Sequence, residues 1–207
     1  MKVVQVAKKL NNTELGKGGT HDTYVLIPND LDVTDIFDEP NKPIEFVDKY
    51  TKEKVKIRNT VGREKRLVGL GHYYRSRDLY AGDEIVFEKQ FLSEKNKYLI
   101  YTQKHENNLV LQKSKYGFEI LTMDRYKEFK DKLATVHNKE VIIEYLRSER
   151  KRNDSPDETE FYDVKIDGES LLEKYKVKDL IEIRLEGNSV SVLSFYGWKK
   201  YTFELEG

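Results

Sequence analysis

Cationic and aromatic side chains are concentrated between Lys65 and Phe87, where the sequence reads KRLVGLGHYYRSRDLYAGDEIVF. Lysine and arginine neutralise phosphate, and the arginine fork matches the O6 and N7 acceptors of guanine in the major groove of DNA. The pattern predicts a short helix, His72–Leu79, between strands at 65–68 and 84–87. A helix held between two strands would present these side chains on a rigid surface that can read nucleic acid.

The net charge of zero conceals an uneven distribution of charge along the chain. Residues 29–50 hold seven acidic side chains and two lysines, whereas residues 51–82 hold nine lysines and arginines and three acids. Such a local excess of positive charge is typical of a surface that faces phosphate. The alternative is a solvated face that the neighbouring acidic block balances.

Four cations surround a predicted turn at Val61-Gly62: Arg58, Arg63, Lys65 and Arg66. We expect at least one of the arginines to read a base. The alternative is that all four contact phosphates only, or are solvated.

Four further candidates lie on the predicted helix: His72, Tyr73, Arg75 and Arg77. His72 could donate to a phosphate beside the helix N-terminal amides, or be an ordinary first-turn residue. Arg75 and Arg77 are two positions apart and so do not share a helix face, which leaves one of them to face phosphate. Tyr73 and its neighbour Tyr74 are more often packing residues of the core or barrel edge than base contacts, so at most one of the two is expected to touch DNA.

Two segments carry a resemblance to a known family. The first, residues 10–28, contains Gly-Gly-Thr-His and ends in Ile-Pro; the second, residues 63–87, ends in Leu-Tyr-Ala-Gly-Asp-Glu-Ile-Val-Phe. In this order and spacing they resemble the B3-type DNA-binding pseudobarrel. The resemblance is to its bacterial branch, found in restriction enzymes such as EcoRII (N-terminal domain) and BfiI (recognition domain). It covers roughly residues 1–115.

The resemblance implies a seven-stranded open pseudobarrel that grips double-stranded DNA with two arms in the major groove. Residues 11–21 would form the N-arm, and residues 58–66, leading into 69–77, the C-arm. The N-arm candidates are Asn11, Asn12, Glu14, Lys17 and His21. Asparagine can pair with adenine, and glutamate can accept a hydrogen bond from cytosine N4. Without the resemblance, an ordinary flexible loop and a structural histidine would explain these residues equally well.

The remaining sequence predicts a mostly β (α+β) chain with few short helices. A helix is expected at 122–136, with Thr122 as its N-cap. We expect a boundary near 137, which separates the pseudobarrel (1–137) from a smaller β-rich subdomain (138–207). The last three expected strands, at 180–185, 190–196 and 201–205, would form an antiparallel meander in that subdomain.

The resemblance therefore implies a target-recognition unit of a bacterial restriction-modification (defence) system. The nuclease or NTPase would lie on another domain or subunit, by analogy with an McrB-like, LlaJI-type subunit. No catalytic residue, metal or cofactor is expected here, since there is no Walker-type loop and no cysteine. The cysteine-free composition fits the cytoplasm, and no apolar run is long enough to suggest a membrane span.

Two alternatives stay open. The first is a self-contained, magnesium-dependent endonuclease, for which Asp157 and the Asp163-Val164-Lys165 triplet have the right residue types at unusually short spacing. The second is a non-catalytic protein-interaction module whose charge serves solubility only.

Overall fold

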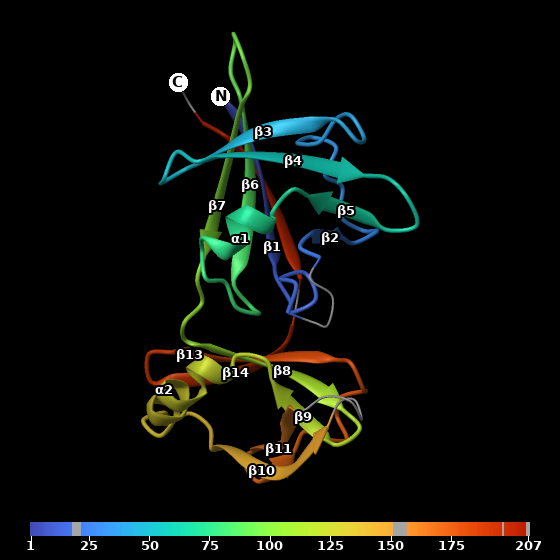
Figure 1. Ribbon diagram of the computed structural model, residues 1–207. Coiled ribbons are helices and arrows are strands. Elements are labelled where there is room, and N and C mark those ends of the chain that lie inside the picture. Colours follow the sequence, from blue (N-terminus) through green and yellow to red (C-terminus); the bar gives the residue numbers. More distant parts are fainter. Residues whose placement is uncertain (18–21, 151–156, 196, 206–207) are drawn as a thin grey trace. The chain divides into compact units, whose positions relative to one another are not determined.

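The computed structural model describes residues 1–17, 22–150, 157–195 and 197–205 (Figure 1). The chain divides into two compact units: unit 1 is Met1–Lys104 with Tyr196–Gly207, and unit 2 is His105–Phe195. The predicted boundary near residue 137 differs from this division, because residues 105–137 belong with the rest of unit 2. The reason is pairing over long sequence distances, since the strand at 108–114 pairs with the strand at 180–186.

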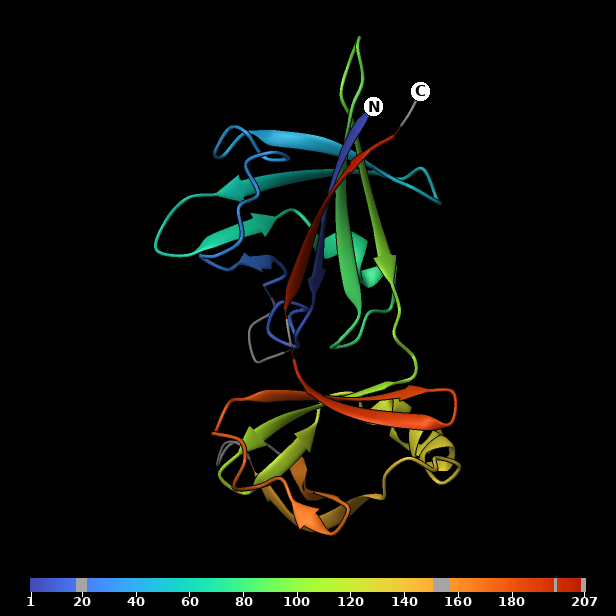
Figure 2. The same ribbon diagram turned by 180° about the vertical axis from the view of Figure 1, so that it is seen from behind.

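Unit 1 is a curled, open sheet with one short helix. Its strands are ordered β15-β1-β6-β7-β3-β4-β5-β2, with β3 and β7 parallel and the other neighbours antiparallel. The elements are β1 (Lys2–Lys9), β2 (Val25–Ile27), β3 (Pro43–Asp48), β4 (Lys54–Thr60), β5 (Lys65–Val68), α1 (Gly71–Arg75), β6 (Glu84–Phe91), β7 (Lys97–Gln103) and β15 (Trp198–Glu204). In Figures 1 and 2 the long strands β1, β6 and β7 run across the direction of β3 and β4.

The mostly β fold class is confirmed, with a detail that the sequence did not predict. The strands of residues 2–103 make seven members of the sheet, and β15 adds an eighth by pairing with β1 from Lys2↔Glu204 to Lys8↔Trp198. The expected C-terminal meander therefore ends at its second strand. Its third strand returns to unit 1, where half-buried Trp198 packs against the core.

The core of unit 1 lies inside the curl of the sheet. Alternation on β3 and β4 places Ile44, Phe46, Val55 and Ile57 inward, where they meet residues of β1, β6 and α1. Phe46 and Phe87 form an edge-to-face pair with ring centroids 5.8 Å apart. This packing fixes the β3–β4 hairpin, so the side chains on its outer face stand on a rigid support.

Unit 2 is a second β-rich unit, in which β12 pairs only with β11 and the other strands are ordered β10-β11-β9-β8-β13-β14. Its elements are β8 (Asn108–Ser114), β9 (Gly117–Ile120), α2 (Met123–Leu133), β10 (Val141–Arg150), β11 (Glu158–Ile166), β12 (Glu169–Ser170), β13 (Leu180–Glu186) and β14 (Ser189–Ser194). Thr122 is the N-cap of α2 as predicted, but its hydroxyl accepts a hydrogen bond from the Val110 amide rather than from the helix. None of the helices in the described ranges is long and apolar enough to cross a membrane.

Candidate nucleic-acid interface

The β4–β5 hairpin carries exposed cations that form no hydrogen bond or ion pair within the described residues. Arg58 lies on β4 opposite Val68, Arg63 lies in the connecting loop, and Lys65 begins β5. All three are exposed and form no hydrogen bond or ion pair with the described part of the chain. A cation without an internal partner can meet a phosphate or a base edge without first breaking a contact.

Arg66 is held differently from these three. Its Nε and Nη2 atoms donate to Oε2 of Glu64 at 3.0 and 2.6 Å, and its guanidinium lies 4.1 Å from the ring centroid of Tyr24. The hydrogen bond with Glu64 raises the pKa of Arg66. The side chain is therefore positioned by Tyr24 while Glu64 occupies its fork. Arg63, Glu64 and Arg66 line a shallow surface hollow.

The outer face of β4 carries two lysines, Lys54 and Lys56, that were not among the predicted site residues. Lys54, Lys56 and Arg58 alternate with buried Val55 and Ile57, so all three point away from the core. Lys54 pairs with Glu45 on β3 at 2.9 Å, whereas Lys56 forms no hydrogen bond or ion pair with the described residues. The strict alternation of the sequence Lys-Val-Lys-Ile-Arg is the signal that could have found this row.

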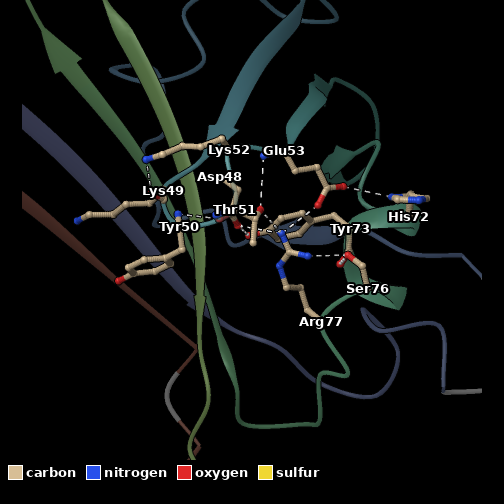
Figure 3. Close-up of polar contacts among 10 residues, drawn as sticks. All are labelled: Asp48, Lys49, Tyr50, Thr51, Lys52, Glu53, His72, Tyr73, Ser76 and Arg77. Atoms are coloured by element: carbon tan, nitrogen blue, oxygen red, sulfur yellow. Dashed lines mark hydrogen bonds and ion pairs between the residues drawn. The ribbon is translucent and has the colours of Figure 1, made fainter.

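The region around α1 is largely structural (Figure 3). The Tyr73 hydroxyl donates to Asp48 Oδ2 at 2.6 Å, and Arg77 Nη2 donates to Asp48 Oδ2 at 3.1 Å and Glu53 Oε2 at 2.9 Å. The Arg77 guanidinium also lies 4.4 Å from the ring centroid of Tyr73, and its side chain is only 16% exposed. Both residues serve the fold, so we remove Tyr73 and Arg77 from the candidate interface.

His72 and Arg75 remain on the surface. The helix is shorter than predicted, Gly71–Arg75 instead of His72–Leu79, and is too short to make an anion site from its N-terminal amides. His72 is exposed, with Nδ1 3.2 Å from Glu53 Oε1 (Figure 3). Arg75 is exposed and has no partner among the described residues, so it joins the available cations.

The predicted N-arm is partly internal. Glu14 is 1% exposed, forms an ion pair with Lys8 Nζ at 3.1 Å, and accepts a hydrogen bond from the Leu26 amide at 2.8 Å. It cannot reach a cytosine, and the prediction for Glu14 is wrong because its carboxylate satisfies buried groups. Asn11 caps the same turn, with Oδ1 accepting from the Glu14 amide at 2.9 Å.

Asn12 and Lys17 are the parts of the N-arm that remain candidates. The Asn12 side chain has no partner among the described residues. Lys17 is exposed, donates to the Leu79 carbonyl at 2.9 Å, and lies 4.3 Å from the Tyr80 ring centroid. His21 lies outside the described residues.

A surface hollow of about 160 Å³ joins the N-arm to the segment that follows α1. Its lining includes Lys17 and Thr23, Arg75 at the end of α1, and Asp78 beyond it. The structure therefore brings Lys17 and Arg75, which are far apart in the sequence, to one surface.

No family model and no curated protein matches this sequence. Among solved structures, the N-terminal domain of Helicobacter pylori LlaJI.R1 is similar to this chain, with 18% sequence identity and a TM-score of 0.37. The match covers 50% of this chain and 82% of that one. A likeness this weak carries no weight for the fold or the function.

The residues considered for a nuclease do not form a metal site. Asp163 is buried and accepts a hydrogen bond from the Ser170 hydroxyl at 2.7 Å, and Lys165 pairs with Glu144 at 2.5 Å. The described residues contain no group of three or more histidine, aspartate or glutamate side chains that could hold a metal ion. Asp157 is exposed at the start of the same region.

Proposed function

We propose that unit 1 binds duplex DNA in a sequence-dependent way, through the β4–β5 hairpin and the N-terminal loop. The observation that carries this proposal is a set of exposed hairpin cations that form no hydrogen bond or ion pair with the described residues: Arg58, Arg63 and Lys65. Such cations also occur elsewhere in the described chain, for example Lys127 and Lys130 on α2. The three in unit 1 stand on a hairpin whose opposite face is fixed in the core.

Sequence dependence is proposed from the residue types at the hairpin tip. A guanidinium fork donates two parallel hydrogen bonds to guanine, which a lysine cannot imitate. Arg63 is the best candidate, since it is exposed in the loop between β4 and β5 and its fork is unoccupied. Asn12 is the candidate reader on the N-terminal loop, because a side-chain amide can pair with adenine.

Phosphate contacts would then set the register of the protein on the duplex. Lys56, Arg58, Lys65 and Arg75 are exposed and form no hydrogen bond or ion pair with the described residues, although Lys56 lies opposite Glu45 on β3; this suits electrostatic contact without base selection. Lys17 would contribute from the N-terminal loop, with Tyr80 beneath its ammonium group.

We further propose that this binding supplies target recognition to a restriction system whose cutting and motor parts lie elsewhere. This step rests on the resemblance of residues 10–28 and 63–87 to the bacterial B3-type pseudobarrel. A curled open sheet, to which residues 2–103 contribute seven strands, is the architecture that the resemblance implies. The buried, hydrogen-bonded state of Asp163 favours a non-catalytic role over the nuclease alternative.

The deciding experiment is selection of bound duplexes from a randomised DNA pool, with parallel titrations at low and moderate salt. A short enriched motif and a steep loss of affinity with salt are expected. Salt-sensitive binding without enrichment would reject sequence reading. No binding at either salt would reject the proposal and favour a protein-interaction module.

A matched pair of variants separates the hairpin from general charge effects. Replacing Arg58, Arg63 and Lys65 by alanine should abolish enrichment of the motif. Replacing Lys127, Lys130 and Lys139 in unit 2 by alanine removes the same formal charge from exposed positions and should leave the motif unchanged. Equal effects of the two triple variants would contradict the assignment to the hairpin.

A further inference from the structure

Strand β10 forms one edge of the unit 2 sheet. It pairs with β11 along one side, from Val141↔Ile166 to Arg150↔Glu158, and among the described residues no strand pairs with its other side. An open edge presents unpaired amide and carbonyl groups, which are a template for another strand. At ten residues β10 is the longest strand in the described chain.

Large apolar side chains lie exposed on this edge strand. Ile142, Tyr145 and Leu146 are 43%, 54% and 42% exposed. Edge strands that avoid association are usually short or carry charges and proline in such places. β10 is long and holds no proline, and its four charged residues include both signs, so a second strand could neutralise them while covering the exposed apolar side chains.

A β-bulge in β10 brings two side chains of opposite charge to the same face of the strand. Glu144 lies opposite Asp163 and Arg147 lies opposite Phe161, so Leu146 is the extra residue. Asp163 and Phe161 are two positions apart and share one face of β11. The extra residue therefore places Glu144 and Arg147 on the same face of β10, on either side of the Tyr145–Leu146 pair.

We propose that β10 pairs antiparallel with β10 of a second copy of this chain, about a two-fold axis at the bulge. In this register Glu144 of each copy lies opposite Arg147 of the other, and the Tyr145–Leu146 pairs meet at the axis. Both side chains retain room for a second partner: Glu144, paired with Lys165, is 52% exposed, and Arg147, paired with Glu149, is 57% exposed. Opposite charges placed across strands stabilise the pairing, and like charges oppose it.

The second copy fits better than a head-to-tail arrangement. The other edge of the sheet, β14, has the sequence Ser-Val-Ser-Val-Leu-Ser and carries no charge. Pairing β10 with β14 of another copy would leave Glu144 and Arg147 without cross-strand partners, and would generate an open filament. When β10 pairs with β10 of the second copy, the two edges cover one another and no β10 edge stays open, so the assembly closes as a dimer.

Sedimentation equilibrium of the whole chain, without DNA, tests this proposal by charge reversal. A small interface of this kind is expected to dimerise with a dissociation constant of about 1–100 µM. Glu144→Arg or Arg147→Glu alone should raise that constant by about tenfold or more, because each sets like charges opposite one another. The double exchange restores opposite charges across the axis and should restore the dimer, although it disrupts both intramolecular ion pairs. Glu140→Arg, an exposed reversal just before β10, should change nothing.

The absence of native cysteines provides a second, independent readout. Tyr145→Cys places a thiol beside the axis and should yield a disulfide-linked dimer on mild oxidation. Val177→Cys, at a residue that is also exposed, should not. A monomer at every concentration, a dimer that ignores both single reversals, or a double exchange that stays dissociated would each overturn the proposal.

Discussion

Arg63 and Arg77 come from the same basic stretch of sequence, yet the fold uses them in opposite ways. Arg63 is exposed between β4 and β5 and has no partner in the described chain. Arg77 is bound by Asp48, Glu53 and Thr51 (Figure 3). The comparison shows that a local excess of positive charge does not by itself identify a binding surface. What matters is which acids the fold brings close.

The acids that bind Arg77 are Asp48 at the end of β3 and Glu53 just before β4. Asp48 also closes the turn between these strands, accepting hydrogen bonds from the Tyr50 and Thr51 amides at 2.8 and 2.7 Å. A basic stretch balanced by acids close to it in the sequence therefore describes Arg77, whereas Arg63 fits the binding interpretation proposed above. The following predictions test this division, in order of decreasing effect.

Removing the acid that binds Arg77 should have the largest effect. Asp48→Ala leaves the Tyr73 hydroxyl, two turn amides and the half-buried Arg77 guanidinium without their acceptor. Breaking a buried ionic network of this kind costs about 3–5 kcal/mol of unfolding free energy. Urea unfolding would measure the loss, with Glu39→Ala as an exposed control. A loss below about 1 kcal/mol, the range of surface pairs, would mean that the cluster is not structural.

The same carboxylate should make stability depend on pH. Burial acts to raise the pKa of Asp48, but hydrogen bonds from Tyr73, Thr51, Tyr50 and Arg77 outweigh burial and hold the pKa below its usual value of 3.8. A carboxylate whose pKa is lowered by folding stabilises the folded state fully above about pH 4. This stabilisation is lost as the pH falls toward the pKa of the folded state. The difference in unfolding free energy between the wild type and Asp48→Asn should thus shrink below about pH 4. A difference that stays constant from pH 7 to the acid limit would contradict this pKa.

For Arg63 the expected change is in binding, with no change in stability. Arg63→Ala should cost about 1–3 kcal/mol at one base pair of the selected site and relax selection there. Arg63→Lys keeps the charge but loses the fork, so it should keep most of the affinity and lose the selectivity. Titrations against single-base variants of the site would separate these outcomes. An equal loss on every sequence would make Arg63 a phosphate contact.

Local sequence patterns predicted the secondary-structure elements that depend on residues close together in the chain. The strands predicted at 65–68 and 84–87 lie within β5 and β6, and the helix predicted at 122–136 contains α2. The pairing of β15 with β1 joins the two ends of the chain, and no periodicity encodes it. The division of the strands between the two units could not be predicted for the same reason.

Prediction of the candidate site from the sequence had the same limit, because residue types and spacing do not show which acids the fold brings to a cation. The cations of the β4–β5 hairpin were predicted from type and spacing, and Arg58, Arg63 and Lys65 are exposed. The burial of Glu14 could not be foreseen, because it depends on Lys8 in β1 and the Leu26 amide in β2. The same holds for Arg77, whose partners Asp48 and Glu53 lie on the far side of the β4–β5 hairpin in the sequence.

Arg66 lies between the two extremes of the comparison and gives its finest test. Tyr24 positions its guanidinium, as in a structural residue, but Glu64 occupies the fork from an exposed loop position. If the hairpin faces DNA, Glu64 competes with phosphate or guanine for this fork and also repels phosphate. Glu64→Gln should therefore tighten DNA binding by about two- to fivefold, within the range of one exposed ion pair.

The gain from Glu64→Gln should fade at moderate salt, because screening weakens both the ion pair and the repulsion. Glu39→Gln is the matched control, since it removes an exposed acid that pairs with Lys42 elsewhere in unit 1. If both changes tighten binding equally, the effect is one of net charge. If Glu64→Gln weakens binding, Glu64 orients Arg66 rather than blocking it, and Arg66 belongs with Arg77 among the residues whose acids are part of the structure.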